Sequence, residues 1–147
     1  QQMGTLPESA LVLGDGKLGA LCALALQERG CQVTMVGKHA TKLDNLRGLV
    51  ATAKLDQVEN LRRDFPLVVE ATGSPSGLAT ALEHVRPGGT IVLKTTVASP
   101  YQLDLSPIVI NELTVLGSRC GRPLDEALRA FELAERAGAG KVLLTVS

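Results

Sequence analysis

The sequence predicts an α/β fold in which a parallel β-sheet carries helices on both faces. Short apolar runs alternate along the chain with segments in which apolar residues recur every three to four positions, as in successive β-α-β units. Among the 147 residues there are one Tyr, two Phe and no Trp, so Leu, Val and Ala must build the core, as where helices pack on a parallel sheet. We therefore expect one domain with a substantial core.

Each element is expected from its own pattern. The first strand is a short apolar run that ends at a glycine, and the helix after it carries Leu18, Leu21, Cys22 and Leu26 on one face before Gly30 ends it. A proline opens the helix after the fourth strand, and further prolines predict a loop over residues 97–111. The expected strands are 10–13, 31–36, 49–53, 66–73, 90–96, 112–118 and 141–146, and the expected helices are 17–29, 41–48, 55–63, 75–85 and 123–138, with a turn at 86–89.

The first strand is followed by GDGKLG, which has G-x-G-x-x-G spacing. The motif follows a strand and opens a periodic helix, which is the context of a dinucleotide pyrophosphate loop. The sequence thus predicts a Rossmann-type doubly wound parallel sheet of about six strands. A purely structural glycine turn is the alternative, and for Lys17 a solvated position on the helix is favoured over a phosphate contact. The candidate residues of this loop are Gly14, Asp15, Gly16, Lys17, Leu18 and Gly19.

The second strand ends at Gly37, where NAD-binding sites usually have an Asp or Glu about 20 residues past the glycines. A carboxylate would repel the 2′-phosphate of NADP, whereas a glycine removes that charge and makes room. Lys38 can supply the opposite charge, and His39 and Lys42 can assist. We predict a preference for NADP, with NAD possible. The alternative is that both lysines are solvated and that Gly37 is only a turn.

Composition excludes several other functions. Lys plus Arg and Asp plus Glu number 15 each, so no electrostatic footprint for nucleic acid exists. Three Cys and two His have no metal-ligand spacing, and we expect reduced thiols, a cytoplasmic protein, no zinc and no catalytic residue in this chain. No signal peptide and no membrane span are expected.

Three stretches carry a family resemblance: VLGDGKLGALCALAL, PLVVEATGSPSGLATALEHVRPGGTIVLKTT and DLSPIVINELTVLGSRCG. In this order and spacing the chain resembles the cofactor-binding half of the medium-chain dehydrogenase/reductase superfamily, the relatives of zinc-type alcohol dehydrogenase and threonine dehydrogenase. The resemblance implies that residues 14–19 hold the pyrophosphate and residues 37–39 the adenosine ribose. It implies that Thr72 and Gly73 line the cofactor crevice and that Thr95 and Thr96 lie near the nicotinamide end.

Alternatives remain for the polar residues after the fourth and fifth strands. The three threonines could simply cap strand ends. Glu70 is the one acid on an apolar strand, and a carboxylate satisfied by backbone donors is favoured over a general base.

The chain also departs from the family pattern. The family's metal ligands and substrate pocket belong mostly to a preceding GroES-like catalytic domain, and that domain is expected to be absent here. The family segment looks shortened near residues 121–123. We therefore expect residues 1–147 to form a single NAD(P)-binding domain.

The expected function is to bind a dinucleotide, with NADP preferred, and to position the nicotinamide for hydride transfer to or from a carbonyl or alcohol in an alcohol dehydrogenase-like oxidoreductase. We expect no turnover by this chain alone. The alternatives are a regulatory nucleotide-binding Rossmann module without redox chemistry and a methyltransferase, and both usually keep the acid that Gly37 replaces. The resemblance implies a homodimer through the strand from Leu113 to Ser118, and the missing catalytic domain of the parent protein as a partner.

Overall fold

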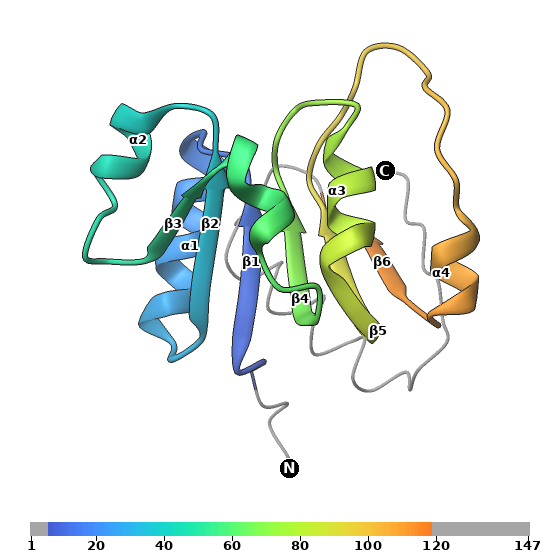
Figure 1. Cartoon of the computed structure of the whole chain (residues 1–147), viewed down its shortest axis with the longest axis horizontal. Coiled ribbons are helices and arrows are strands. Elements are labelled where there is room, and N and C mark those ends of the chain that lie inside the picture. Colours follow the sequence, from blue (N-terminus) through green and yellow to red (C-terminus); the bar gives the residue numbers. More distant parts are fainter. Residues whose placement is uncertain (1–5, 119–147) are drawn as a thin grey trace.

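The computed structural model describes residues 6–118 as a parallel sheet with helices on both faces (Figure 1). All neighbouring strands are parallel, in the order β3-β2-β1-β4-β5-β6. This is the doubly wound Rossmann-type order predicted from the sequence. The strands are β1 (Ser9–Leu13), β2 (Gln32–Gly37), β3 (Ala51–Lys54), β4 (Phe65–Glu70), β5 (Val85–Leu93) and β6 (Thr114–Gly117).

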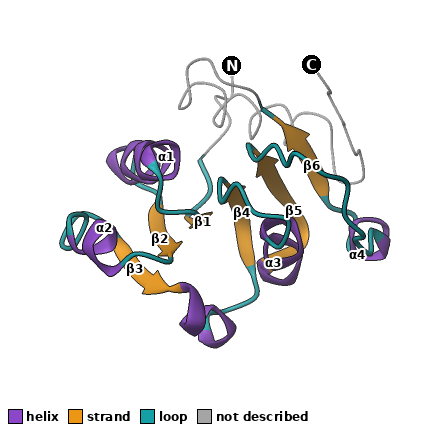
Figure 2. Cartoon of the chain, turned by 90° about the horizontal axis from the view of Figure 1, so that it is seen from above, coloured by secondary structure: helices purple, strands orange, loops and turns teal. Residues whose placement is uncertain are grey.

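Helices cover the sheet from two sides, as Figure 2 shows for α1 and α3. Strand β1 alternates between two cores, with Ala10 and Val12 in the core that α1 covers and Leu11 and Leu13 in the core that α3 covers. This alternation is the two-residue period of a strand buried on both faces. The helices are α1 (Lys17–Glu28), α2 (Ala40–Asp44), the 3₁₀ helix η1 (Leu55–Asn60), α3 (Gly77–His84) and α4 (Ser106–Ile110).

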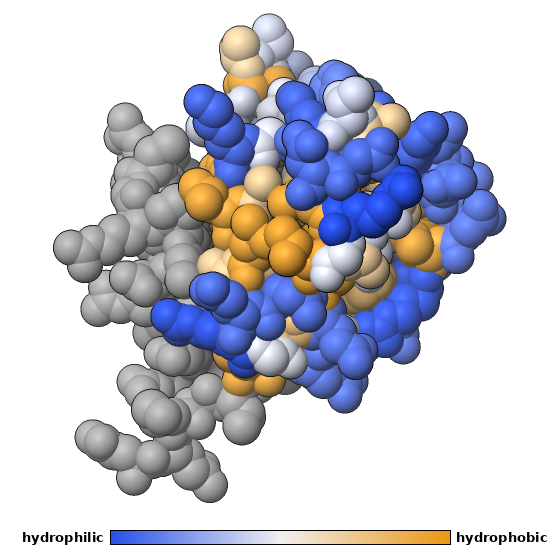
Figure 3. All heavy atoms as spheres, turned by 90° about the vertical axis from the view of Figure 1, so that its left-hand side faces the viewer, coloured by the Kyte–Doolittle hydropathy of each residue, from blue (hydrophilic) through white to orange (hydrophobic). Residues whose placement is uncertain are grey.

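The two outer strands differ in burial. Three of the four residues of β3 are exposed. Figure 3, which views that side of the molecule, shows an apolar patch with hydrophilic residues above and below it. Thr114, Val115 and Leu116 of β6 are buried. Strand β3 has only four residues and ends at Lys54, and a short edge strand with a lysine is poorly suited to pairing with another chain.

Strand β5 begins earlier than the sequence predicted. The prediction of a turn at 86–89 is wrong, because β5 already starts at Val85, which pairs with Phe65. The ladder then shifts register between Phe65 and Leu67, and Gly88 adopts a φ of 72°. An irregularity of this kind lets a strand absorb a Pro-Gly-Gly sequence without ending.

The stretch predicted as a loop contains a helix. Pro107 stands in the first turn of α4, where its missing N–H and fixed φ are tolerated. The prediction of a helix at 55–63 holds only in part, since the segment forms the shorter 3₁₀ helix η1. The expected helix at 123–138, the strand at 141–146 and the shortened segment near 121–123 lie outside the described residues.

Within residues 6–118, no helix has the length and apolar character needed to cross a membrane.

Candidate functional site

A cavity of about 330 Å³ opens at the carboxyl ends of β1, β2 and β4. Strand β1 lies between β2 and β4. Strands β1 to β3 follow one another across the sheet in one direction and strands β4 to β6 in the opposite direction, so the strand order reverses between β1 and β4. Ligands of open parallel sheets bind in this place. The sequence-predicted residues that line the cavity are Gly14, Asp15, Gly16, Gly37, Lys38, His39, Lys42 and Thr72.

The first and third glycines of the loop are required by the protein's own packing. Gly14 has a φ of 114°, and a Cβ there would come 2.3 Å from the Ala71 carbonyl oxygen. A Cβ at Gly19 would lie 2.1 Å from the Gly14 carbonyl oxygen, which brings α1 close to the end of β1. Both positions therefore exclude any side chain.

Gly16 is different, because a Cβ built there meets no atom within 4 Å. It is exposed at the start of α1 and lines the cavity. No packing inside the described protein explains a glycine at this position. Gly16 is the N-cap residue of α1, a position that glycine tolerates well, and its open side leaves the backbone accessible from the cavity.

The other predicted loop residues lie beside the cavity and do not line it. Lys17 is exposed, which agrees with the solvated position favoured from the sequence. Leu18 is partly buried and packs against the core on the α1 face.

Gly37 leaves space that Asp15 fills. A Cβ at Gly37 would lie 2.4 Å from the Asp15 Cβ and 2.7 Å from its Oδ2. The sequence suggested that this glycine makes room for a phosphate. In the structure the Asp15 side chain, which comes from the glycine loop, fills the space that a side chain at position 37 would need, and room for a phosphate stays a prediction.

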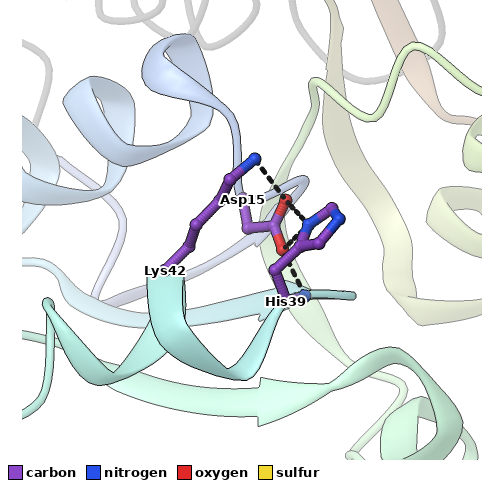
Figure 4. A network of polar contacts seen from close by, with 3 residues as sticks. All are labelled: Asp15, His39 and Lys42. Carbon is purple, nitrogen blue, oxygen red and sulfur yellow. Dashed lines mark hydrogen bonds and ion pairs between the residues drawn. The ribbon is translucent and has the colours of Figure 1, made fainter.

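The Asp15 carboxylate accepts hydrogen bonds from His39 (Figure 4). Its Oδ2 lies 2.6 Å from the His39 backbone nitrogen and 2.9 Å from the His39 Nδ1. Since an ionised carboxylate only accepts, Nδ1 is the donor. The Lys42 Nζ lies 4.0 Å from the Asp15 Oδ1. Burial acts to raise the pKa of Asp15, but the His39 hydrogen bonds and the charges of His39 and Lys42 hold it below 3.8.

Glu70 is fully buried at the end of β4 and shapes the loop beside the cavity. Its Oε1 accepts from the Thr72 backbone N–H at 2.9 Å and from the Thr72 hydroxyl at 2.5 Å. Its Oε2 has no hydrogen-bond partner among the described residues. The favoured interpretation, a carboxylate satisfied by backbone donors, holds only in part, because one backbone N–H donates to Oε1 and none within residues 6–118 donates to Oε2. Glu70 does not line the cavity.

Gly73 and Thr95 connect the loops that follow β4 and β5. The Gly73 backbone N–H donates to the Thr95 Oγ1 at 3.0 Å. Thr96 is exposed, and neither threonine lines the cavity. The contact holds the two loops together at the carboxyl ends of neighbouring strands.

Residues 6–118 offer no side chains suited to metal binding or to catalysis by a thiol. No cluster of three or more His, Cys, Asp or Glu side chains there could hold a metal ion. Cys22 and Cys31 are buried free thiols, and burial raises the pKa of Cys31 to about 11. A thiol with that pKa is a poor nucleophile at neutral pH.

Known proteins match most of this chain. A family model described as the glucose dehydrogenase C-terminus matches residues 1–121. The glucose 1-dehydrogenase of Thermoproteus tenax is 33% identical over 141 residues, which cover 90% of this chain and 39% of that protein. The D-altritol 5-dehydrogenase of Agrobacterium fabrum is 30% identical over 138 residues, covering 89% of this chain and 41% of that protein. The chain thus spans less than half the length of these relatives.

A solved structure shares the fold. Glucose dehydrogenase from Haloferax mediterranei, in complex with NADP, Zn and gluconolactone, aligns with a TM-score of 0.67 at 20% identity. The alignment covers 92% of this chain and 42% of that one.

Proposed function

The chain belongs to the glucose dehydrogenase C-terminal family, within the medium-chain dehydrogenase/reductase superfamily, and from this premise we propose that it is an NADP-preferring dinucleotide-binding domain. It would position the nicotinamide of an alcohol dehydrogenase-like oxidoreductase. The single observation that carries this proposal is the convergence on one cavity of the glycine loop and the cationic turn after β2.

The charge around the cavity supports the preference for NADP. Strand β2 ends at Gly37 without a carboxylate, and the next residue, Lys38, is exposed and lines the cavity. Lys42 lines it from α2. Two ammonium groups beside the ribose position favour a 2′-phosphate, which carries nearly two negative charges at neutral pH. The neighbouring Asp15 offsets part of this positive charge.

The residues fit the pyrophosphate and ribose of a dinucleotide. The open space at Gly16 admits a phosphate close to the backbone, and Gly14 and Gly19 hold the loop in shape. Thr72 forms the opposite wall. When bound, the nicotinamide supplies the hydride chemistry, and the protein supplies binding and orientation.

Known relatives suggest the kind of substrate. The two relatives named above are dehydrogenases of glucose and D-altritol, and the glucose dehydrogenase structure named above is a complex with NADP. We therefore propose that hydride moves between NADP and an alcohol or carbonyl carbon in the longer protein of which this fold is the cofactor half.

Calorimetric titration of the chain with NADPH, NADH, ATP and S-adenosylmethionine tests the proposal. We expect NADPH to bind most tightly, and Lys38→Ala to weaken NADPH binding roughly tenfold with little effect on NADH. Arg63→Ala is the matched control, because it removes one positive charge just before β4, at the opposite end of the strands. Tightest binding of ATP would instead support a regulatory nucleotide-binding module.

A further inference from the structure

Three donors surround the Asp15 carboxylate and form what we term the donor cluster: the His39 backbone N–H, the His39 ring Nδ1 and the Lys42 ammonium. All three belong to the turn after β2 and the start of α2. One amide, one imidazole and one ammonium group are a set of donors that binds a phosphate as readily as a carboxylate. In the structure these donors contact an anion of the same chain, the Asp15 carboxylate.

The position of Asp15 is fixed by packing as well as by charge. Its side chain is only 10% exposed, whereas those of His39 and Lys42 are 58% and 53% exposed. Its Cβ and carboxylate rest in the space above Gly37. The carboxylate therefore occupies the donor cluster from inside the protein, while the donors themselves remain accessible from solvent.

We infer that Asp15 is a specificity-determining residue, whose carboxylate competes with the 2′-phosphate of the cofactor for the donor cluster. This inference rests on the proposed function and adds to it a source of selectivity within the glycine loop. The 2′-phosphate of NADP must displace the carboxylate or share its donors. NAD carries a hydroxyl there, which can donate to the carboxylate and leaves the donor cluster undisturbed.

The direction of the effect follows from charge. Two anions that share one set of donors repel each other, and the repulsion is appreciable because Asp15 is mostly shielded from water. Asp15 therefore reduces a preference for NADP that the lysines would otherwise make larger. Removing its charge while keeping its shape should strengthen NADP binding and should not strengthen NAD binding.

The test is the variant Asp15→Asn in the full 147-residue chain. We expect NADPH to bind about tenfold more tightly, and NADH to bind equally well or more weakly. Adenosine 2′,5′-bisphosphate and AMP, which lack the nicotinamide half, should show the same difference. Asp44→Asn is the matched control, because Asp44 lies on α2 and pairs with Arg47 at an exposed position.

Each outcome is decisive. Unchanged or weaker NADPH binding by Asp15→Asn, or a gain of equal size for NADH and AMP, would overturn the inference. Asp15→Ser repeats the charge removal with a smaller side chain, in case the amide disturbs folding. Absence of dinucleotide binding by the unsubstituted chain would contradict the proposed function instead, and the bisphosphate fragment would still report on the donor cluster.

Discussion

The side chain of Asp15 fills the space that a side chain at Gly37 would need. A Cβ at Gly37 would lie 2.4 Å from the Asp15 Cβ, far inside van der Waals contact. The two residues lie 22 positions apart, at the ends of the neighbouring parallel strands β1 and β2. The carboxylate that strand β2 lacks is thus supplied by the glycine loop.

The first prediction concerns this contact directly. Gly37→Ala should lower the free energy of unfolding by about 1–3 kcal/mol, because the new methyl group collides with the Asp15 Cβ, which lies next to the backbone and cannot swing away. Urea denaturation measures the change. The control is Gly16→Ala, because a Cβ at Gly16 would meet no atom within 4 Å. Gly30→Ala is unsuitable as a control, because Gly30 has a φ of 91°. Equal stability of the Gly37→Ala and Gly16→Ala variants would contradict the account.

The second prediction is a double-mutant cycle. Gly37→Asp should destabilise the chain and gain little NADH affinity, because its carboxylate meets that of Asp15. Combined with Asp15→Gly, the same substitution should regain stability and bind NADH better than NADPH. Denaturation and calorimetry of the four proteins give the coupling between the two sites, which we expect to reach about 1 kcal/mol or more. Strictly additive effects would show that the two positions do not share one space.

The third prediction concerns pH. The pKa of Asp15 is lowered below 3.8 in the folded protein, so the unfolded chain takes up this proton at a higher pH than the folded one. The stabilisation by Asp15 is therefore complete only above about pH 5, well above the pKa of the unfolded chain, and is lost as the pH falls through the lower pKa of the folded protein. Asp15→Asn should be less stable than the unsubstituted chain at pH 6, and the difference should shrink toward pH 3. A constant difference over this range would contradict the assigned ion pairs.

The fourth prediction concerns Glu70. Glu70→Ala removes the acceptor of the Thr72 backbone N–H and hydroxyl and leaves a hole in a fully buried position. We expect a loss of about 2–4 kcal/mol in the free energy of unfolding. Glu70→Gln keeps one acceptor oxygen and should cost less than about 1 kcal/mol. Glu83→Gln on the exposed side of α3 is the control for charge.

The fifth prediction is the homodimer through β6, which remains a proposal. Strand β6 is one of the two outer strands of the described sheet, and the preceding α4 exposes Val109 and Ile110 by 78% and 76%. Replacing both residues with Lys should weaken self-association at least tenfold, because exposed apolar surface of this kind drives association. Light scattering over a range of protein concentrations measures it. A monomer without any substitution would contradict the proposal.

The sequence predicted the succession of strands and helices because apolar periodicity is strong in β1, α1 and β4. The prediction failed at proline and glycine residues, because these residues occur in loops and turns but also in the first turn of a helix or within an irregular strand. Pro107 stands in the first turn of α4 instead of marking a loop, and residues 86–89 belong to β5, whose ladder with β4 shifts register. Local residue preferences do not reveal such positions, because the neighbouring strand decides them.

The sequence also predicted that the glycine loop and the turn after β2 share one site, and both segments line one cavity. It missed the contacts of Asp15 with Gly37 and His39. The G-x-G-x-x-G pattern says nothing about the second residue. The relevant signal lies in the topology: β1 and β2 are parallel neighbours, so the residues that follow them lie side by side. On that basis, Asp15 after the first strand could have been predicted to contact Gly37 and His39 at the end of the second.

The central claim is that the cavity beyond β1 and β2 binds a dinucleotide and prefers one with a 2′-phosphate. The most direct measurement is a calorimetric titration of the chain with NADPH and NADH under identical conditions, repeated with Lys38→Asp. The account predicts that NADPH binds at least tenfold more tightly and that the substitution reverses or removes this preference. Equal or tighter binding of NADH, with no effect of Lys38→Asp, would contradict it.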